Sequence, residues 1–289
     1  MRALIIGSGG MLATDLEAVL AAGGHEVRPL TIHDLDITDA DAADGLISQW
    51  SSGTDSVVFN CAAYTNVDGA EADEAAAHLI NAVGPANLAG ACARAGADLV
   101  HISTDYVFPG DAQTPYEVDS PTGPKSAYGR TKLAGEQAVR SLAPSSYVVR
   151  TAWLYGAGGK NFVRTMASLE RDRETLTVID DQRGSPTWSR DLSESLVALA
   201  STRAYGIYHC TNSGDTTWCG FARAVFEEVG ADPMRVRPCT TADYPLPAPR
   251  PAYSVLSGAA LAGAGVPPMR PWRDALKAAF AEAGDAFRG

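Results

Sequence analysis

Two patterns alternate through the first half of the chain, and this alternation limits the possible fold more than any other feature. Short, uniformly apolar runs occur at Ala3–Ile6, Val57–Phe59, Leu99–Ile102 and Tyr147–Val149, and Val27–Leu30 is a less apolar candidate. Such runs are typical of parallel strands that are buried on both faces. Between them lie Ala- and Leu-rich stretches of helical length, at Leu12–Ala22, Ala40–Trp50, Glu74–Ala95 and Ser126–Leu142. The pattern predicts an α/β fold with a Rossmann-type, doubly wound parallel sheet.

The second half of the chain has a different texture, with more glycine, proline and arginine. Helices are expected at Asn161–Arg171, Arg190–Ala200, Thr217–Val229 and Trp272–Ala283, and short strands at Leu176–Ile179 and Gly206–His209. The Pro-rich segment Pro245–Pro251 predicts an extended loop. We therefore expect one domain over residues 1–152 and a smaller, mixed C-terminal lobe over residues 153–289, from which some segments return to the first domain.

Composition and charge exclude several classes of function. The net charge of −11 argues against a broad nucleic-acid surface, because such binding needs clustered Lys and Arg. The apolar run at the N-terminus is too short for a signal peptide, and no stretch approaches the ~20 apolar residues that a membrane helix needs. The five cysteines are odd in number and contain no C-x-x-C pair, which favours free thiols. These features predict a cytoplasmic protein that binds neither nucleic acid nor membrane.

A glycine-rich turn follows the first predicted strand and opens the first predicted helix. It contains Gly7, Gly9 and Gly10, followed by Met11 and Leu12. Glycine permits a tight turn and close approach of backbone N–H groups to a pyrophosphate, which the positive end of the helix also attracts. A purely structural turn is the alternative, but the position after the first strand favours a site for NAD(P).

The second predicted strand bears on which of the two cofactors is used. An acid at its end would bind the ribose hydroxyl of NAD, whereas an arginine nearby would suit NADP. The sequence there has Arg28 and no acid directly at the end of the strand. NADPH is therefore the expected cofactor, with NADH as the alternative.

Tyr128 and Lys132 are the main candidates for catalysis. They stand four residues apart in a predicted helix, so both side chains lie on one face. Ketone reduction needs a proton donor beside the carbonyl oxygen, and a neighbouring ammonium is expected to bring the tyrosine pKa toward neutrality. Thr104 and Asp105 follow the fourth predicted strand, where polar side chains face the ligand crevice. Thr104 is expected to polarise a carbonyl and Asp105 to bind a sugar hydroxyl, although both residues could simply cap the strand.

With these residues in place, the chain resembles the dTDP-4-dehydrorhamnose reductases, a family of extended short-chain dehydrogenase/reductases. The resemblance runs nearly from end to end. Besides the glycine turn, it is carried by the segments LDITD (35–39), NCAAYTNVD (60–68), STDYVF (103–108), YGRTKLAGE (128–136), RTAWLY (150–155), DQRGSPT (181–187) and Arg250-Pro251.

The resemblance implies an activity and a set of roles. The reaction would reduce the C4 ketone of a dTDP-4-keto-6-deoxyhexose, converting dTDP-4-dehydro-L-rhamnose to dTDP-L-rhamnose in the type case. Tyr128 would be the proton donor, Lys132 its partner, and Thr104 the third catalytic residue. Expected cofactor contacts, besides Tyr128 and Lys132, are Gly7, Gly10, Met11, Leu12, Asp36, Ile37, Ala62, Ala63, Tyr64 and Tyr106. Thr104, Asp105 and Trp153 would bind the sugar, and Arg183 and Arg250 are candidates for its diphosphate because planar guanidinium groups suit phosphate oxygens.

Departures from the family pattern keep other interpretations open. Arg183 and Trp188 in the segment 181–188 leave room for an altered sugar pocket, and hence for a reductase of another NDP-4-keto sugar, as in antibiotic or streptose-type pathways. A sugar-nucleotide epimerase or dehydratase would need an additional acid–base pair to abstract a proton from carbon. Such enzymes often have a Glu beside the catalytic Ser or Thr, whereas the neighbour of Thr104 here is Asp105. A non-catalytic, cofactor-binding regulatory subunit is the third alternative, and the presence of both Tyr128 and Lys132 argues against it.

Metal binding and assembly are the last expectations from the sequence. Some members of the family are metal-bridged dimers, but no His/Cys/Asp/Glu spacing here demands a metal. Asp15 is explained as an acid in the first turn of a helix. We therefore expect no metal, and a monomer or weak homodimer.

Overall fold

The computed structural model describes residues 1–51 and 55–288 and has a parallel β-sheet at its centre. The strand order is β10-β5-β4-β3-β1-β2. Their bounds are β1 Arg2–Ile6, β2 Glu26–Leu30, β3 Ser56–Asn60, β4 Asp98–Thr104, β5 Ser146–Thr151 and β10 Gly206–His209. Each expected strand is confirmed within three residues at either end. The order reverses between β1 and β3, which is where ligands bind in open α/β sheets.

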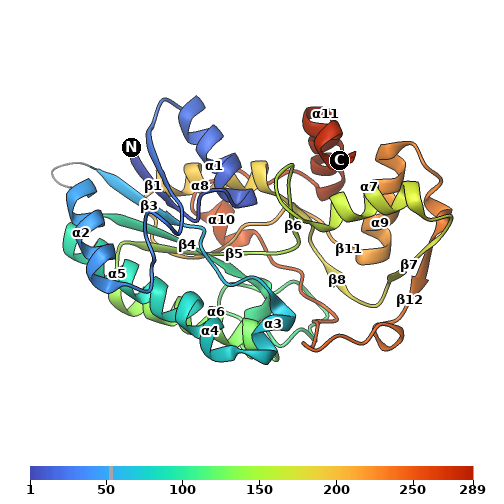
Figure 1. Cartoon of the computed structure of the whole chain (residues 1–289), viewed down its shortest axis with the longest axis horizontal. Helices are drawn as coiled ribbons and strands as arrows, with labels where there is room; N and C mark the ends of the chain where they lie inside the picture. The colour runs from blue at the N-terminus through green and yellow to red at the C-terminus, as the bar shows by residue number, and fades with distance from the viewer. Residues whose placement is uncertain (52–54, 289) are drawn as a thin grey trace.

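Helices cover both faces of this sheet (Figure 1). One face carries α1 (Met11–Ala22), α8 (Ser189–Ala200) and the short α10 (Ala259–Gly263), and the other carries α2 (Ala40–Ser51), α5 (Gly84–Ala95) and α6 (Ala127–Leu142). The strand side chains divide between the two cores: Ile5, Phe59 and Val149 face α1 and α8, whereas Leu4, Val58 and Val148 face α2, α5 and α6. Burial on both faces explains why these strands appear as continuous apolar runs.

The long helix expected at Glu74–Ala95 is interrupted. The structure has α4 (Glu74–His78), a π-helical turn (Leu79–Val83) and then α5, which begins with Gly84 and Pro85. The turn places the Asn81 side chain so that its Oδ1 accepts from Tyr64 N at 2.9 Å and its Nδ2 donates to Thr131 Oγ1 at 3.1 Å. The π-turn thus ties the loop after β3 to helix α6, and such turns are frequent at functional sites.

The second lobe packs helices against a small parallel pair of strands (Figure 1). It contains α7 (Phe162–Asp172), α9 (Trp218–Val229), α11 (Trp272–Arg288), β7 (Leu176–Ile179) and β12 (Val236–Cys239). The same half of the chain contains the two-residue strands β6 (Leu154–Tyr155), β8 (Arg183–Gly184), β9 (Thr187–Trp188) and β11 (Thr216–Thr217). Strand β6 pairs with β9. The expected helices are confirmed, although α11 continues past Ala283, where the backbone is not helical, to Arg288. Elements of the second half also belong to the central sheet and its cover: β10 pairs with β5, and α8 and α10 pack on one face.

The remaining short elements lie in the connections between the elements named above. They are helix α3 (Val67–Ala72) and the single 3₁₀ turns Asp105–Val107, Pro233–Arg235 and Thr241–Asp243. The Pro-rich segment 245–251 lacks regular structure, as expected.

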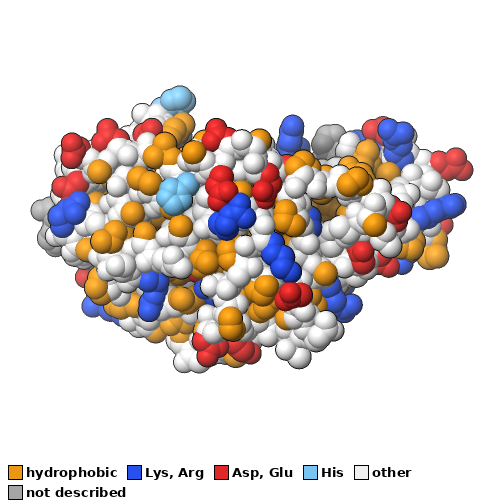
Figure 2. Space-filling view, turned by 90° about the horizontal axis from the view of Figure 1, so that it is seen from below, with side chains coloured by type: hydrophobic (Ala, Val, Ile, Leu, Met, Phe, Trp, Pro, Cys, Tyr) orange, Lys and Arg blue, Asp and Glu red, His pale blue; other side chains and the backbone are white. Residues whose placement is uncertain are grey.

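The surface mixes charges of both signs. On the face that Figure 2 shows, acidic and basic side chains lie interspersed among polar and hydrophobic ones. Over residues 1–51 and 55–288, no helix combines the length and the apolar character needed to cross a membrane.

Candidate active site

A cavity of about 1040 Å³ lies at the carboxyl ends of the sheet strands, where the two lobes meet. Its walls come from the glycine turn, the loops after β2, β3 and β4, the start of α6, and residues of the second lobe. Most of the expected site residues line it: Gly7, Gly10, Met11, Leu12, Asp36, Ile37, Ala62, Ala63, Thr104, Asp105, Tyr106, Tyr128, Lys132 and Trp153. Side chains that are far apart in the sequence therefore share one cavity of the size that organic ligands occupy.

The glycine turn has a geometry that side chains would obstruct. Gly7 has a φ of +89°, and a Cβ atom there would lie 2.8 Å from Ala62 N. The N–H groups of Gly7 and Ser8 both donate to Leu30 O, at 3.0 and 2.9 Å. Gly10 precedes α1 and makes no side-chain cap, so the first N–H groups of the helix have no such partner. The turn forms a cradle of backbone next to a positive helix end, which fits a pyrophosphate.

The loop after β2 forms the far end of the cavity, with Thr31, His33 and Asp36 among its lining residues. Asp36 Oδ1 accepts from Thr38 N at 2.9 Å and from Thr38 Oγ1 at 2.8 Å, and these bonds lower the pKa of Asp36. Arg28, the residue that suggested NADPH, is exposed on β2, and its guanidinium carbon lies 6.0 Å from the Trp50 ring centroid. Arg28 is not part of the cavity wall, so its bearing on cofactor choice stays a prediction.

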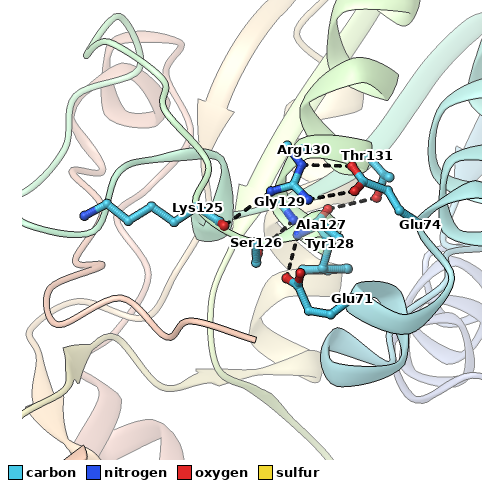
Figure 3. A network of polar contacts seen from close by, with 9 residues as sticks. All are labelled: Glu71, Glu74, Lys125, Ser126, Ala127, Tyr128, Gly129, Arg130 and Thr131. Carbon is cyan, nitrogen blue, oxygen red and sulfur yellow. Dashed lines mark hydrogen bonds and ion pairs between the residues drawn. The ribbon is translucent and has the colours of Figure 1, made fainter. Parts of the chain in front are cut away.

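Helix α6 is fixed at its start by acidic residues of α3 and α4 (Figure 3). Glu71 Oε1 accepts from Ala127 N at 2.8 Å, and Arg130 forms an ion pair with Glu74 at 2.7 Å. The helix also has its own cap, because Ser126 Oγ accepts from Gly129 N at 3.1 Å. The carboxylate of Glu71 at a helix N-terminus is favoured both by the hydrogen bond and by the helix dipole. These contacts set the position of the turn that carries Tyr128.

Tyr128 is protonated at neutral pH in this structure. Burial raises the pKa of Tyr128 to about 12, the negative charge of Asp105 adds to the shift, and a hydrogen bond with Thr104 opposes it. The expectation that Lys132 brings this pKa toward neutrality is therefore wrong, because desolvation dominates. The protonated phenol is nevertheless the form that a proton donor must have.

Lys132 is a buried lysine beneath the same cavity. Its Nζ donates to Ile102 O at 2.7 Å, and burial lowers the pKa of Lys132 to about 8, against the opposing charge of Glu136. Lys132 therefore remains mostly an ammonium at neutral pH. A cation held on the face of α6 that carries Tyr128 favours negative charge forming on the phenol oxygen.

Thr104 ends strand β4 and Asp105 begins the 3₁₀ turn that follows, and both residues line the cavity. Thr104 Oγ1 donates to Asp105 Oδ1 at 2.9 Å and accepts from Tyr106 N at 3.2 Å, so the Thr104 hydroxyl partly caps the 3₁₀ turn that follows. Burial raises the pKa of Asp105 to about 6. The Thr104 side chain thus caps the turn and also lines the cavity.

A buried ion pair lies behind the catalytic candidates. Arg150 Nη2 lies 2.7 Å from Glu136 Oε2, and each side chain is only 3% exposed. Ser103 Oγ donates to Glu136 Oε1 at 2.5 Å, and Arg150 Nη1 donates to Val118 O at 3.1 Å. The pair joins β4, β5 and α6, the elements that carry Thr104 and Lys132. Glu136 stands four residues after Lys132, so the two side chains share one face of α6. That spacing alone does not reveal that Glu136 pairs with Arg150.

Three of the expected site residues lie outside the wall of the large cavity. Arg183 forms an ion pair with Asp215, and its side chain is half exposed. Arg250 Nη2 donates to Asp68 Oδ2 at 2.8 Å, and Arg250 lines a smaller cavity of about 170 Å³ beside Tyr106. Tyr64 is bound through its backbone to Asn81. The diphosphate role of the two arginines therefore stays a prediction, and each has a carboxylate partner already.

Other residues of the wall were not expected from the sequence. Lys160, Gln182 and Trp218 are among them, all from the second half of the chain. Gln182 belongs to the segment 181–187 that carries the family resemblance, so the sequence contained a signal that could have identified it. No motif around Trp218 indicates that it lines the cavity. Trp188, which suggested an altered pocket, is instead buried in the core of the second lobe.

Asp15, expected as an acid in the first turn of a helix, lies past the first turn of α1, and its side chain has a structural partner. Its carboxylate accepts a hydrogen bond from Ser189 Oγ, which joins α1 to α8, and burial raises the pKa of Asp15. Within the part of the chain that the structure describes, no three potential metal ligands of the His, Cys, Asp or Glu type come together. The expectation that the protein needs no metal stays a prediction.

Comparison with known proteins assigns the family. A family model described as RmlD substrate binding domain matches residues 1–284. The chain belongs to this family. Among its relatives, the dTDP-4-dehydrorhamnose reductase of Mycobacterium tuberculosis is 50% identical over 286 residues, which cover 97% of this chain and 92% of the relative. The match confirms the resemblance that the sequence motifs indicated.

Two further relatives of this chain bear on its function. The probable dTDP-4,6-dihydroxy-2-methyloxan-3-one 4-ketoreductase of Streptomyces antibioticus is also 50% identical, over 97% of this chain and 95% of the relative. The crystal structure of the dTDP-4-dehydrorhamnose reductase of Bacillus anthracis in complex with NADP has a TM-score of 0.93 and 37% identity, and the match covers 97% of this chain and 99% of that one. The fold is therefore that of the family's reductases.

Proposed function

We propose that the chain reduces the C4 ketone of a dTDP-4-keto-6-deoxyhexose with NADPH, most directly dTDP-4-dehydro-L-rhamnose to dTDP-L-rhamnose. One observation carries this proposal: Tyr128, Lys132 and Thr104 line the same cavity as the glycine turn. A proton donor, its cationic partner and a cradle for a dinucleotide are what ketone reduction requires. The relatives named above support the sugar nucleotide and the cofactor.

The residues present fit NADPH. The space beside Gly7 has no room for a side chain, and the start of α1 offers N–H groups without a side-chain cap. Gly10, Met11 and Leu12 would hold the pyrophosphate, Asp36 and Ile37 the adenine end, and Ala62, Ala63 and Tyr106 the remaining length. When bound, the reduced nicotinamide supplies the hydride that the carbonyl carbon receives.

The protein's own side chains would supply and stabilise the proton transfer. The Thr104 hydroxyl would turn from Asp105 Oδ1 to donate its hydrogen bond to the carbonyl oxygen and polarise it, while Asp105 and Trp153 hold the sugar. Tyr128 transfers its phenolic proton to the oxygen as negative charge develops there. The Lys132 ammonium stabilises the phenolate that remains, until a proton from solvent restores the phenol.

A second candidate within the same class is a reductase of a different dTDP-4-keto sugar. The relative from Streptomyces antibioticus, named as a 4-ketoreductase of another sugar, is as similar to this chain as the mycobacterial rhamnose enzyme is. The catalytic residues do not separate the two substrates, because specificity depends on a few contacts in the pocket. Product analysis with both keto sugars decides between them.

The two halves of the chain would divide the work. Residues 1–152 would bind mainly the cofactor and residues 153–289 mainly the sugar, which is supported by the origin of the glycine turn in the first half and of Trp153 and Gln182 in the second. We further propose that the protein is cytoplasmic and is a monomer or weak homodimer. Sedimentation velocity over a range of protein concentrations tests the state of association.

The variant Tyr128→Phe tests the assigned chemistry. Without the phenolic proton, the rate of keto-sugar-dependent NADPH oxidation should fall by about 10²-fold or more, while the affinity for NADPH changes little. Tyr205→Phe is the matched control, because the Tyr205 hydroxyl bonds to Asp98 on the surface, away from the cavity. Wild-type turnover in Tyr128→Phe would exclude Tyr128 as the proton donor.

A further inference from the structure

Trp153 has an unusual backbone conformation for a bulky residue. Its φ of +46° lies in the left-handed region, which it shares with Arg203 among the non-glycine residues that the structure describes. Such a conformation is unfavourable for a residue with a large side chain and persists only where the surroundings enforce it. Trp153 stands between β5 and β6, its side chain is half buried, and it lines the cavity. The contacts of its indole ring therefore decide what shape this part of the wall has.

Two close contacts bear on the position of that ring. The ring of Trp218 stacks on it with a centroid distance of 3.5 Å and an interplanar angle of 8°. Gly184 also meets the ring at close range, since a Cβ atom at Gly184 would lie 2.5 Å from Cε2 of Trp153. Any larger residue at 184 would displace the indole.

The same short β-ladder delivers both contacts. Strand β8 ends at Gly184 and pairs antiparallel with β11, with Thr216 opposite Gly184. Trp218 follows β11 directly and begins α9, where Thr217 Oγ1 accepts from Gly220 N at 3.0 Å. Phe162 packs against Trp218 with the two ring planes tilted by 52° and their centroids 4.6 Å apart. Trp218 is thus anchored by a strand pair, a helix cap and a neighbouring ring.

From this arrangement we infer that Trp218 is a positioning residue, which holds the indole of Trp153 in the cavity wall and thereby sets the fit of the keto sugar. The inference rests on the proposed function, in which Trp153 contacts the sugar. Trp218 also lines the cavity, but its stacked face is committed to Trp153. Trp218 therefore acts on the sugar mainly through Trp153.

The test combines kinetics with a spectroscopic signature of the stack. Trp218→Leu removes the stacked partner, Trp218→Phe keeps an aromatic ring, and Gly184→Ala pushes on the indole without touching Trp218. Stacked indoles couple electronically, so the circular dichroism of the indole bands reports the pair directly. Trp50→Phe is the matched control, because Trp50 lies on α2 and packs against Arg2.

The expected result for Trp218→Leu is a rise in KM for the keto sugar on the order of tenfold, with a smaller change in kcat and an unchanged KM for NADPH. Its difference spectrum should match that of Trp153→Leu, because both variants abolish the same indole pair. Gly184→Ala should raise the same KM and weaken the same signal, Trp218→Phe should restore part of the KM, and Trp50→Phe should leave the KM and the paired-indole signal unchanged.

Each adverse outcome is decisive. A Trp218→Leu protein that has lost the coupled signal but keeps the wild-type KM for the sugar overturns the inference. If Trp218→Leu does not fold, unchanged sugar KM values in both Trp218→Phe and Gly184→Ala overturn it. If the wild-type protein oxidises no NADPH with any keto sugar, the proposed function fails instead, and the positioning claim then depends on whether Gly184→Ala weakens the indole coupling.

Discussion

The buried pair of Glu136 and Arg150 makes a quantitative prediction about stability. Both side chains are 3% exposed, and Arg150 reaches the Glu136 carboxylate through three hydrogen-bond distances of 2.7, 3.0 and 3.2 Å. The change Glu136→Gln keeps the shape of the side chain but leaves the Arg150 charge buried without its counter-charge. Breaking one partner of such a pair costs about 3–5 kcal/mol.

The size of the chain converts this cost into a temperature shift. An unfolding entropy of about 2 cal/mol/K per residue, taken over 289 residues, gives about 0.6 kcal/mol/K for the whole protein. The melting temperature of Glu136→Gln should therefore fall by about 5–8 °C. Urea unfolding followed by far-UV circular dichroism measures the same change as a free energy.

A double variant separates loss of charge balance from loss of packing. In Glu136→Leu/Arg150→Met neither side chain of the pair carries a charge, so this protein should recover at least part of the free energy that Glu136→Gln loses. Glu194→Gln is the surface control, because Glu194 is exposed and its partner Arg190 is partly exposed, so the pair should contribute less than about 1 kcal/mol. The reasoning is refuted if Glu136→Gln unfolds with wild-type stability, or if the double variant is no more stable than Glu136→Gln.

Three further predictions follow from the cavity and its supports. Gly7→Ala should abolish NADPH binding in a fluorescence titration, because the new Cβ would lie 2.8 Å from Ala62 N; binding at wild-type affinity would move the pyrophosphate site elsewhere. Glu71→Ala should lower the free energy of unfolding by about 1 kcal/mol, because the N–H of Ala127 at the start of α6 loses its acceptor; an unchanged urea midpoint would argue against this cap. Because burial lowers the pKa of Lys132 to about 8, its positive charge is present below that pH and lost above it, so kcat should fall as pH rises through about 8, and a flat profile to higher pH would contradict the role of the ammonium.

The fold could be predicted largely from the sequence, because strands buried on both faces must be uniformly apolar. The sequence runs around Ile5, Val58 and Val149 are uniformly apolar, so these strands can be recognised from the sequence alone. The π-turn at Leu79–Val83 could not be predicted in this way. It depends on how closely α6 approaches, since a Cβ on Gly135 would lie 2.1 Å from Asn81 O, and this distance is a property of tertiary packing.

The candidate site divides in the same manner. Residues that follow strands, such as Thr104 and Ala62, were predictable because the carboxyl ends of parallel strands meet at one edge of the sheet. Arg183 and Arg250 lie outside the large cavity because Asp215 and Asp68 pair with them, and a sequence does not reveal which carboxylate an arginine will meet.

Two other features depend on the folded environment as well. Trp218 reaches the wall only through the β8–β11 pairing, which joins segments about thirty residues apart. The raised pKa of Tyr128 has a similar origin, because the degree of burial, and not the spacing to Lys132, determines it.

The central claim is that this chain is an NADPH-dependent reductase of a dTDP-4-keto sugar, and absorbance at the NADPH band tests it most directly. Purified protein, NADPH and dTDP-4-dehydro-L-rhamnose generated in situ should lose absorbance at a rate that depends on the sugar and disappears in Tyr128→Phe. Bound NADPH with no oxidation, for this sugar and for a panel of other dTDP-4-keto sugars, would contradict the account and leave a cofactor-binding protein without reductase activity.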